Sequence, residues 1–152
     1  MSTIAVLKDA IVCKTLMMAL LTVATAGLYP LLWLYRHYRT IDEVTQVKTA
    51  SDTLVIWIAV CIGIGGVLMH SGDDASAGFG LLVSLVANIL YIVWAFKAKA
   101  ALEEYALREF KVDLRMNAFY TFVLNVFYIN FTINSLPDAL RRQQILTGGQ
   151  PS

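Results

Sequence analysis

Uncharged apolar stretches alternate with short charged stretches along the whole 152-residue chain. Every Lys, Arg, Asp and Glu lies outside four segments, which are residues 16–35, 54–72, 75–96 and 117–137. Each segment is close to the ~20 residues that a helix needs to cross the roughly 30 Å hydrocarbon core of a bilayer. Because lipid offers no hydrogen-bond partner to an open backbone, the pattern predicts an all-α membrane protein with four transmembrane helices, arranged as two tandem hairpins.

The first and last segments leave a second interpretation open. Pro30 removes one backbone hydrogen bond inside residues 16–35, so a kink is expected near Ala26–Gly27. Alternatively, the stretch "AGLYP" folds this segment into a re-entrant hairpin whose two ends lie on the same side of the membrane. Residues 117–137 are open to the same alternative.

Basic residues predict the orientation of the chain. The link after the first segment holds Arg36, Arg39 and Lys48, and the link after the third is basic as well, whereas "SGDDASA" between the second and third has two acids and no base. The positive-inside rule therefore places the first and third links in the cytoplasm. Four spanning helices would then put Lys8, Lys14, Arg141 and Arg142 outside, and this conflict keeps the re-entrant alternative open.

One aromatic and basic pattern occurs twice. Trp33-x-Tyr35-Arg36 matches Trp94-x-Phe96-Lys97, and a tyrosine, Tyr29 or Tyr91, lies about one helical turn before each tryptophan. Trp and Tyr favour the headgroup level, and Arg and Lys reach beyond it, so these eight residues are expected to be membrane-interface anchors. The repetition indicates a tandem duplication in parallel orientation, in which the first and third segments run from outside to inside.

The two copies also resemble a known family. "GLYPLLWLYR" and "LYIVWAFK" are similar to a Gly-x-Tyr-x-x-x-Trp-x-Tyr-Lys segment that is repeated in a family of small bacterial membrane proteins. "FVLNVFYINFTIN", residues 122–134, resembles the closing helix of those proteins, so the resemblance extends over residues 15–138. The chain departs from the pattern at Pro30, where a small residue is usual. The family has no established activity, so the resemblance implies a bacterial inner membrane and no mechanism.

Small and polar side chains predict how the helices pack. Folding the chain at Asp73–Asp74 brings small residues of the second and third segments together, which lets two helices approach closely. The expected packing residues are Ala59, Gly63, Gly66, Gly80, Ser84 and Asn88. Simple hairpin packing is one interpretation of this seam, and a narrow permeation path is the other.

The fourth segment has a polar face at helical spacing, formed by Thr121, Asn125, Tyr128 and Thr132. Amides at membrane depth require a partner, and Asn88 is the expected partner of Asn125. The alternative to such internal hydrogen bonding is a self-association face or a polar lining in an oligomer.

The stretch after the third segment is expected to be cytoplasmic. Residues 97–115 are predicted to continue the third helix as an amphipathic extension, which lies on an anionic leaflet, docks another protein or merely connects two helices. Residues 1–140 form a single helical membrane domain in this interpretation. Residues 141–152 form a flexible tail with a short basic helix.

Composition and motifs exclude several functions. The net charge of +1 gives no reason to expect nucleic acid as a partner, and no acidic or basic side chain lies inside the segments, which disfavours proton-coupled transport. No catalytic, metal or cofactor motif is present, so an enzyme is not expected. The only acids that could serve a lipid-modifying enzyme are interpreted as solvated helix ends: Asp42, Glu43, Glu103 and Glu104.

The predicted function is therefore a non-enzymatic module embedded in the inner membrane. Such a module would act through the lipid bilayer and a membrane or cytoplasmic protein partner, or through self-association. The alternative is a small homo-oligomeric channel or passive transporter, with the polar face of the fourth segment lining the path.

Overall fold

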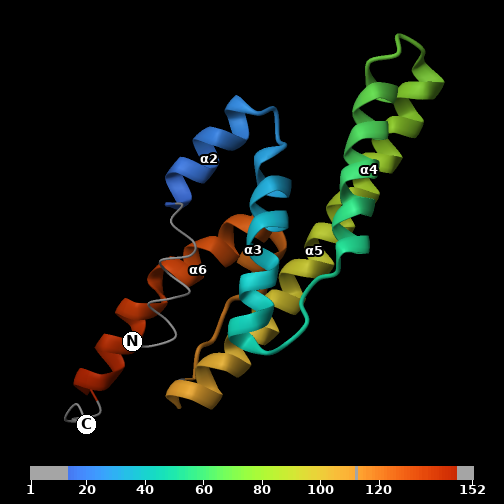
Figure 1. Cartoon of the computed structure of the whole chain (residues 1–152). Helices are drawn as coiled ribbons and strands as arrows, with labels where there is room; N and C mark the ends of the chain where they lie inside the picture. Colours follow the sequence, from blue (N-terminus) through green and yellow to red (C-terminus); the bar gives the residue numbers. More distant parts are fainter. Residues whose placement is uncertain (1–13, 112, 147–152) are drawn as a thin grey trace.

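The computed structural model describes residues 14–111 and 113–146. The described part is all-α, as predicted, and contains five helices (Figure 1). They are α2 (Thr15–Ala24), α3 (Tyr29–Thr45), α4 (Asp52–Met69), α5 (Asp74–Phe110) and α6 (Ala118–Leu146). Residues 141–146, at the start of the predicted tail, belong to α6. Lys8 and residues 147–152 lie outside the described residues.

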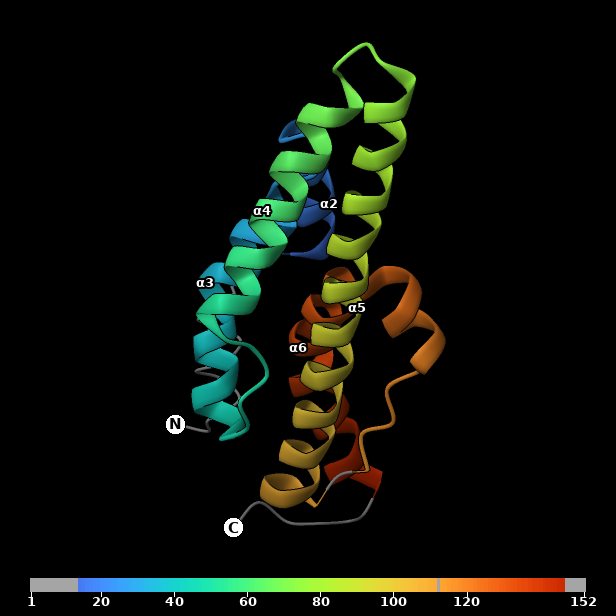
Figure 2. The same cartoon turned by 90° about the vertical axis from the view of Figure 1, so that its right-hand side faces the viewer.

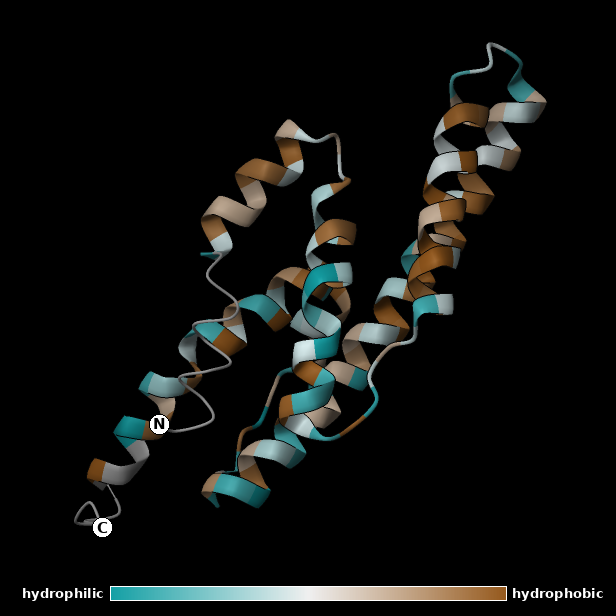
Figure 3. Cartoon of the chain, viewed as in Figure 1, coloured by the Kyte–Doolittle hydropathy of each residue, from teal (hydrophilic) through white to brown (hydrophobic). Residues whose placement is uncertain are grey.

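Helices α4 and α5 form a long antiparallel hairpin (Figure 2). Ser51 caps α4 by accepting a hydrogen bond from the Leu54 N–H, and Asp73 caps α5 by accepting one from Ser76 N–H at 3.0 Å. Among the described residues, these two helices are long and apolar enough to cross a membrane, and four such helices are not found. Only 22% and 28% of their most apolar stretches are buried, so most of their apolar side chains face outward (Figure 3).

Two glycines set the closest approach of α4 and α5. A Cβ added at Gly80 would lie 2.8 Å from both the Gly65 carbonyl oxygen and the Met69 amide nitrogen. Gly80 and Ser84 thus pack at the seam as predicted, but the predicted partners on α4 are wrong. Ala59, Gly63 and Gly66 are exposed, and a Cβ at either of those two glycines would meet nothing within 4 Å. The physical reason is helical register, because the seam passes through Cys61 and Gly65, which are buried on the opposite side of α4.

The predicted span 16–35 is two helices rather than one kinked helix. α2 ends at Ala24, the chain reverses direction over the next four residues, and α3 runs back beside α2 (Figure 1). Pro30 is not a kink inside a continuous helix, since it occupies the first turn of α3, where its missing N–H costs nothing. The path of the chain matches the hairpin alternative at "AGLYP".

The predicted span 117–137 is also interrupted. Asn125 has non-helical backbone angles and divides α6 into a short first part and a long second part. Figure 2 shows the first part rising to the bend and the second part descending behind α5. Val126, Ile129 and Ile133 of the second part are buried in the main hydrophobic core, and the helix continues past Pro137.

The two aromatic copies meet in the core. α3 and α5 run in the same direction, as the repeat predicted (Figure 1). The Trp33 and Trp94 rings pack edge to face with centroids 6.4 Å apart. Both tryptophans and Tyr91 are buried, so the prediction that they are lipid-interface anchors is wrong. The physical reason is that the two aromatic copies pack against each other in the core. Tyr35, Arg36, Phe96 and Lys97 are exposed, and Tyr29 is partly buried against the core.

The predicted extension of the third helix is present and ends at Phe110. Most of its apolar side chains pack against the rest of the chain, including α6, whereas Leu107 is exposed. Ala98 and Leu102 are buried in the main core, and Tyr105 packs with Leu136 and Leu140 of α6 in a second cluster.

We expect Gly80→Ala to destabilise the fold by about 1–3 kcal/mol, because its methyl group would overlap backbone atoms of α4 that cannot rotate away. Gly78→Ala on the same helix is the matched control. Its methyl group enters open space, so it should leave stability unchanged or raise it by up to about 1 kcal/mol. Thermal unfolding of both variants in one detergent tests this, and equal melting temperatures would contradict the seam.

Candidate functional site

A cavity of about 460 Å³ lies where both helix interruptions meet the α4–α5 hairpin. We call it the break cavity. Its wall comes from four places: the α2–α3 turn, α4, the middle of the apolar stretch of α5, and the bend of α6. The lining residues are Ala26, Gly27, Pro30, Ile62, Gly66, Ser84, Ala87, Asn88, Tyr91, Ile92 and residues 122–127. None of them carries a charge at neutral pH.

The first interruption is a helix cap followed by a helix start. Gly27 N–H donates to the Thr22 carbonyl at 2.8 Å and Ala26 N–H to the Val23 carbonyl at 3.2 Å, which is the Schellman pattern that closes a helix. Ala26 and Gly27 have φ values of 50° and 90°, the left-handed region in which glycine is least strained. Thr25 joins the two helices, because its hydroxyl donates to the Leu21 carbonyl and accepts from Tyr29 N–H.

The second interruption rests on one residue. Asn125 has φ 48° and ψ −116°, a conformation outside both the right-handed and left-handed helical regions. Such a backbone costs a non-glycine residue on the order of 1–3 kcal/mol and persists only where the surroundings hold it. The side-chain oxygen Oδ1 of Asn125 is buried and has no hydrogen-bond partner among the described residues.

A second polar group without a partner lies on the same wall. Tyr91 is 9% exposed, and its hydroxyl is buried with no hydrogen-bond partner in residues 14–111 and 113–146. Asn88, predicted to bind Asn125, lines the same cavity but donates to the Ser84 carbonyl one turn back on its own helix at 3.3 Å. Tyr91 and Asn125 both line the break cavity, so its wall contains two residues with a buried polar atom that lacks a partner in the described part.

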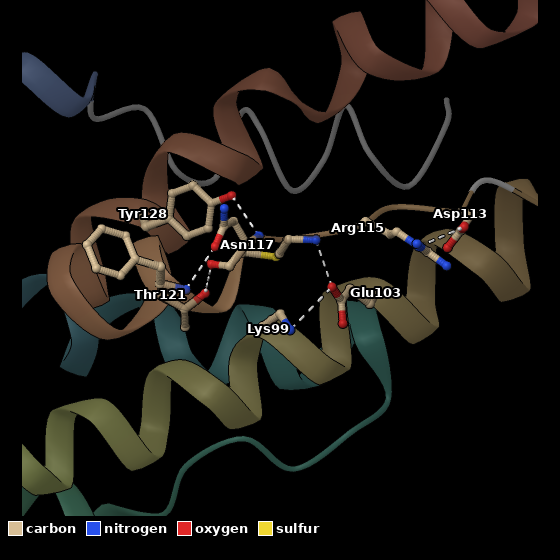
Figure 4. A network of polar contacts seen from close by, with 9 residues as sticks. Lys99, Glu103, Asp113, Arg115, Asn117, Thr121 and Tyr128 are labelled. Atoms are coloured by element: carbon tan, nitrogen blue, oxygen red, sulfur yellow. Dashed lines mark hydrogen bonds and ion pairs between the residues drawn. The ribbon is translucent and has the colours of Figure 1, made fainter.

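The predicted polar face of α6 does not form one surface. The bend at Asn125 separates Thr121 from the other members, and the buried hydroxyls of Thr121 and Thr132 donate to backbone carbonyls four residues back, at 3.0 and 2.9 Å. The Tyr128 hydroxyl accepts from Asn117 N–H at 3.2 Å (Figure 4). Apart from Asn125, these side chains form hydrogen bonds with the backbone of α6 or of Asn117 just before it, and not with a neighbouring helix.

Two of the four candidate acids brace linkers at the far end of α5. Asp42 accepts from Thr49 N–H at 2.8 Å and fixes the α3–α4 linker. Glu103 accepts from Met116 N–H at 2.7 Å and pairs with Lys99 at 3.7 Å, which fixes the α5–α6 linker (Figure 4). Glu43 and Glu104 are exposed, as expected for solvated helix ends, whereas that interpretation is wrong for Asp42 and Glu103.

Further polar contacts hold the same end together. Arg39 donates to an Asp52 carboxylate oxygen at 2.9 Å, and the Tyr38 hydroxyl donates to the same oxygen. The hydrogen bond to Asp52, together with burial, raises the pKa of Tyr38 above its usual range. Arg108 of α5 donates to the last carbonyl of α3, that of Thr45, at 3.0 Å.

Comparison with known families identifies the family of the chain. Residues 14–104 match the family described as Domain of unknown function (DUF4234). The chain belongs to this family. The match includes the first interruption and both tryptophan copies, whereas the expected resemblance of residues 122–134 lies beyond it. No curated protein and no solved structure matches the chain.

Sequence reasoning named most of the cavity residues for other roles. Asn88 and Asn125 were expected to bind each other, Tyr91 was expected at the lipid interface, and Gly66 in the hairpin seam. The "AGLYP" stretch carried a signal for the first interruption, because glycine closes a helix and proline begins one. No comparable signal marks Asn125.

We expect Asn125→Gly to stabilise the fold by about 1 kcal/mol, because glycine adopts this backbone conformation without strain. Asn125→Ala removes the same amide but keeps a Cβ, so it should be less stable than Asn125→Gly by about 1 kcal/mol or more. Thermal unfolding of the two variants in one detergent measures the difference. If alanine proved as stable as glycine, the bend would not exist as described.

Proposed function

We propose that the protein is a polytopic membrane protein in which α4 and α5 cross the bilayer, while the α2–α3 turn and the α6 bend enter it without crossing. Large apolar side chains exposed on three elements support the location. Val23 of α2 is 81% exposed, Val67 of α4 is 74% exposed, and Phe122 lies outward on the first part of α6. Soluble monomers rarely expose contiguous apolar patches of more than a few hundred Å².

Helix lengths support the two re-entrant hairpins. α2 has ten residues and is about 15 Å long at 1.5 Å per residue, which is half of the roughly 30 Å hydrocarbon core. α3 is uncharged from Tyr29 to Tyr35 and becomes basic at Arg36, so its apolar part is no longer than α2. The first part of α6, residues 118–124, is shorter still.

The observation that carries the proposal is the reversal of the chain at both interruptions. With α4 and α5 as the only spanning helices of the described part, all its Lys and Arg residues fall on one side of the membrane. The α4–α5 turn, with Asp73 and Asp74 and no base, falls on the other. The positive-inside rule is then satisfied at Lys14, Arg141 and Arg142, where four spans would violate it.

Within this topology we assign the protein a non-enzymatic role as an accessory or interaction module of the inner membrane, the compartment implied by its family resemblance. Asp42 and Glu103 support this role, because both carboxylates are engaged with linker backbone. The outward face of α4, with Gly63 open, is free to approach lipid or a partner helix.

Cysteine accessibility tests the topology. In a background without Cys13 and Cys61, we expect Ser71→Cys to react with a membrane-impermeant maleimide on intact spheroplasts. Lys14→Cys and Arg142→Cys should react only after the membrane is permeabilised. Labelling of all three on intact spheroplasts would establish four spans and refute the proposal.

Native mass spectrometry in a mild detergent separates the module from the homo-oligomeric channel. We expect a monomer, alone or with a different protein, since the residues that line the break cavity come from a single chain. A single homo-oligomeric mass would contradict the module and favour the channel.

A further inference from the structure

We propose that the break cavity binds an uncharged, lipid-soluble molecule that carries a hydroxyl group. The inference rests on the proposed membrane location, because it takes the ligand from the bilayer. The ligand would have an apolar body against the hydrocarbon wall and a hydroxyl between Tyr91 and Asn125.

The two polar atoms without partners favour a ligand that carries a hydroxyl group over one that does not. The Asn125 Oδ1 atom can only accept a hydrogen bond, and the Tyr91 hydroxyl can donate one. A ligand hydroxyl satisfies both at once, since it has one hydrogen to donate and lone pairs to accept. An ether or an ester carbonyl would leave Asn125 without a donor, and a hydrocarbon would leave both groups unsatisfied.

The absence of charge on the lining residues excludes ionised ligands. None of the lining residues, all of which lie in the described part, is Lys, Arg, Asp or Glu. A carboxylate, phosphate or ammonium group would lose its water here without gaining a countercharge, which is strongly unfavourable. The ligand is therefore neutral.

The remaining wall indicates an apolar body and entry from the bilayer. Ile62, Ala87 and Ile92 supply hydrocarbon from the spanning hairpin, and Phe127 supplies an aromatic ring from α6. Phe122 is both a lining residue and exposed on the outer surface, so this part of the wall is continuous with the face proposed to contact lipid. The volume of about 460 Å³ falls within the range of small-molecule sites.

Photolabelling tests the inference. The full chain in phosphatidylcholine nanodiscs would be irradiated with a long-chain alcohol that carries a diazirine, and the labelled peptides would be mapped by mass spectrometry. We expect labels in residues 84–92 and 122–127. A diazirine hydrocarbon without the hydroxyl should label these peptides about a hundredfold less, because it loses both hydrogen bonds. The matching fatty acid at neutral pH should label them at least about tenfold less, because its carboxylate would lose its water without gaining a countercharge.

Two variants connect the label to the polar atoms. Tyr91→Phe removes only the hydroxyl, and Asn125→Gly removes the amide while permitting the bend, so each should lower labelling by the alcohol about tenfold. Tyr35→Phe is the matched control, because Tyr35 is 59% exposed and lies outside the cavity, and it should label as the unmodified protein does.

Three results would overturn the inference. They are equal labelling by the hydrocarbon and the alcohol, labelling that persists in Tyr91→Phe, and loss of label on addition of glycerol to the buffer, which would indicate a water-soluble ligand. The cysteine labelling of the Ser71 and Lys14 variants tests the topology independently of ligand binding. Correct topology with labelling that ignores Tyr91 refutes the inference alone, whereas a four-span topology refutes the proposed function itself.

Discussion

A helix interrupted at membrane depth exposes backbone N–H and C=O groups that lipid cannot satisfy, and this constraint governs the proposed arrangement. The described part of the chain has two helix interruptions, at Ala26–Gly27 and at Asn125, which the proposed topology places at membrane depth, and both line one cavity together with residues of α5. The first is closed by its own Schellman hydrogen bonds and by Thr25. The second is held by the burial of the following turns of α6. There the buried side-chain oxygen of Asn125 has no hydrogen-bond partner in the described part.

The apolar pattern predicts helices well and chain direction poorly. Residues 54–72 and 75–96 became α4 and the upper part of α5 with ends shifted by only a few residues, because capping by Ser51 and Asp73 coincides with the onset of apolarity. An uncharged apolar run such as residues 16–35 shows only that the segment is compatible with lipid. It does not show whether the segment forms one spanning helix or two half-length helices. Proline and glycine marked the turn in the first case, whereas residues 117–136 contain neither, so no such residue marks the bend at Asn125.

The tandem copies predicted the relative direction of two helices correctly and the surroundings of their tryptophans wrongly. Trp33 and Trp94 indicated two segments running the same way, and the structure has α3 and α5 parallel. Their burial could not be predicted from one copy alone, because each tryptophan is covered by the other. Adjacent exposed residues, Arg36 and Lys97, still occupy the position expected of a helix leaving the apolar layer.

The charge distribution and the cavity follow from the same topological choice. In the proposed topology, two half-length hairpins would bring every described basic residue to one side of the membrane. They would also fill only half of the layer beside α4 and α5, so their tips would end against the middle of the spanning pair. Linkers braced by Asp42 and Glu103 limit how far the hairpins can slide along α5. The space beside Tyr91 and Asn125 is uncharged, and its position is set by charged contacts at the other end of the hairpins, which the proposed topology places in the cytoplasm.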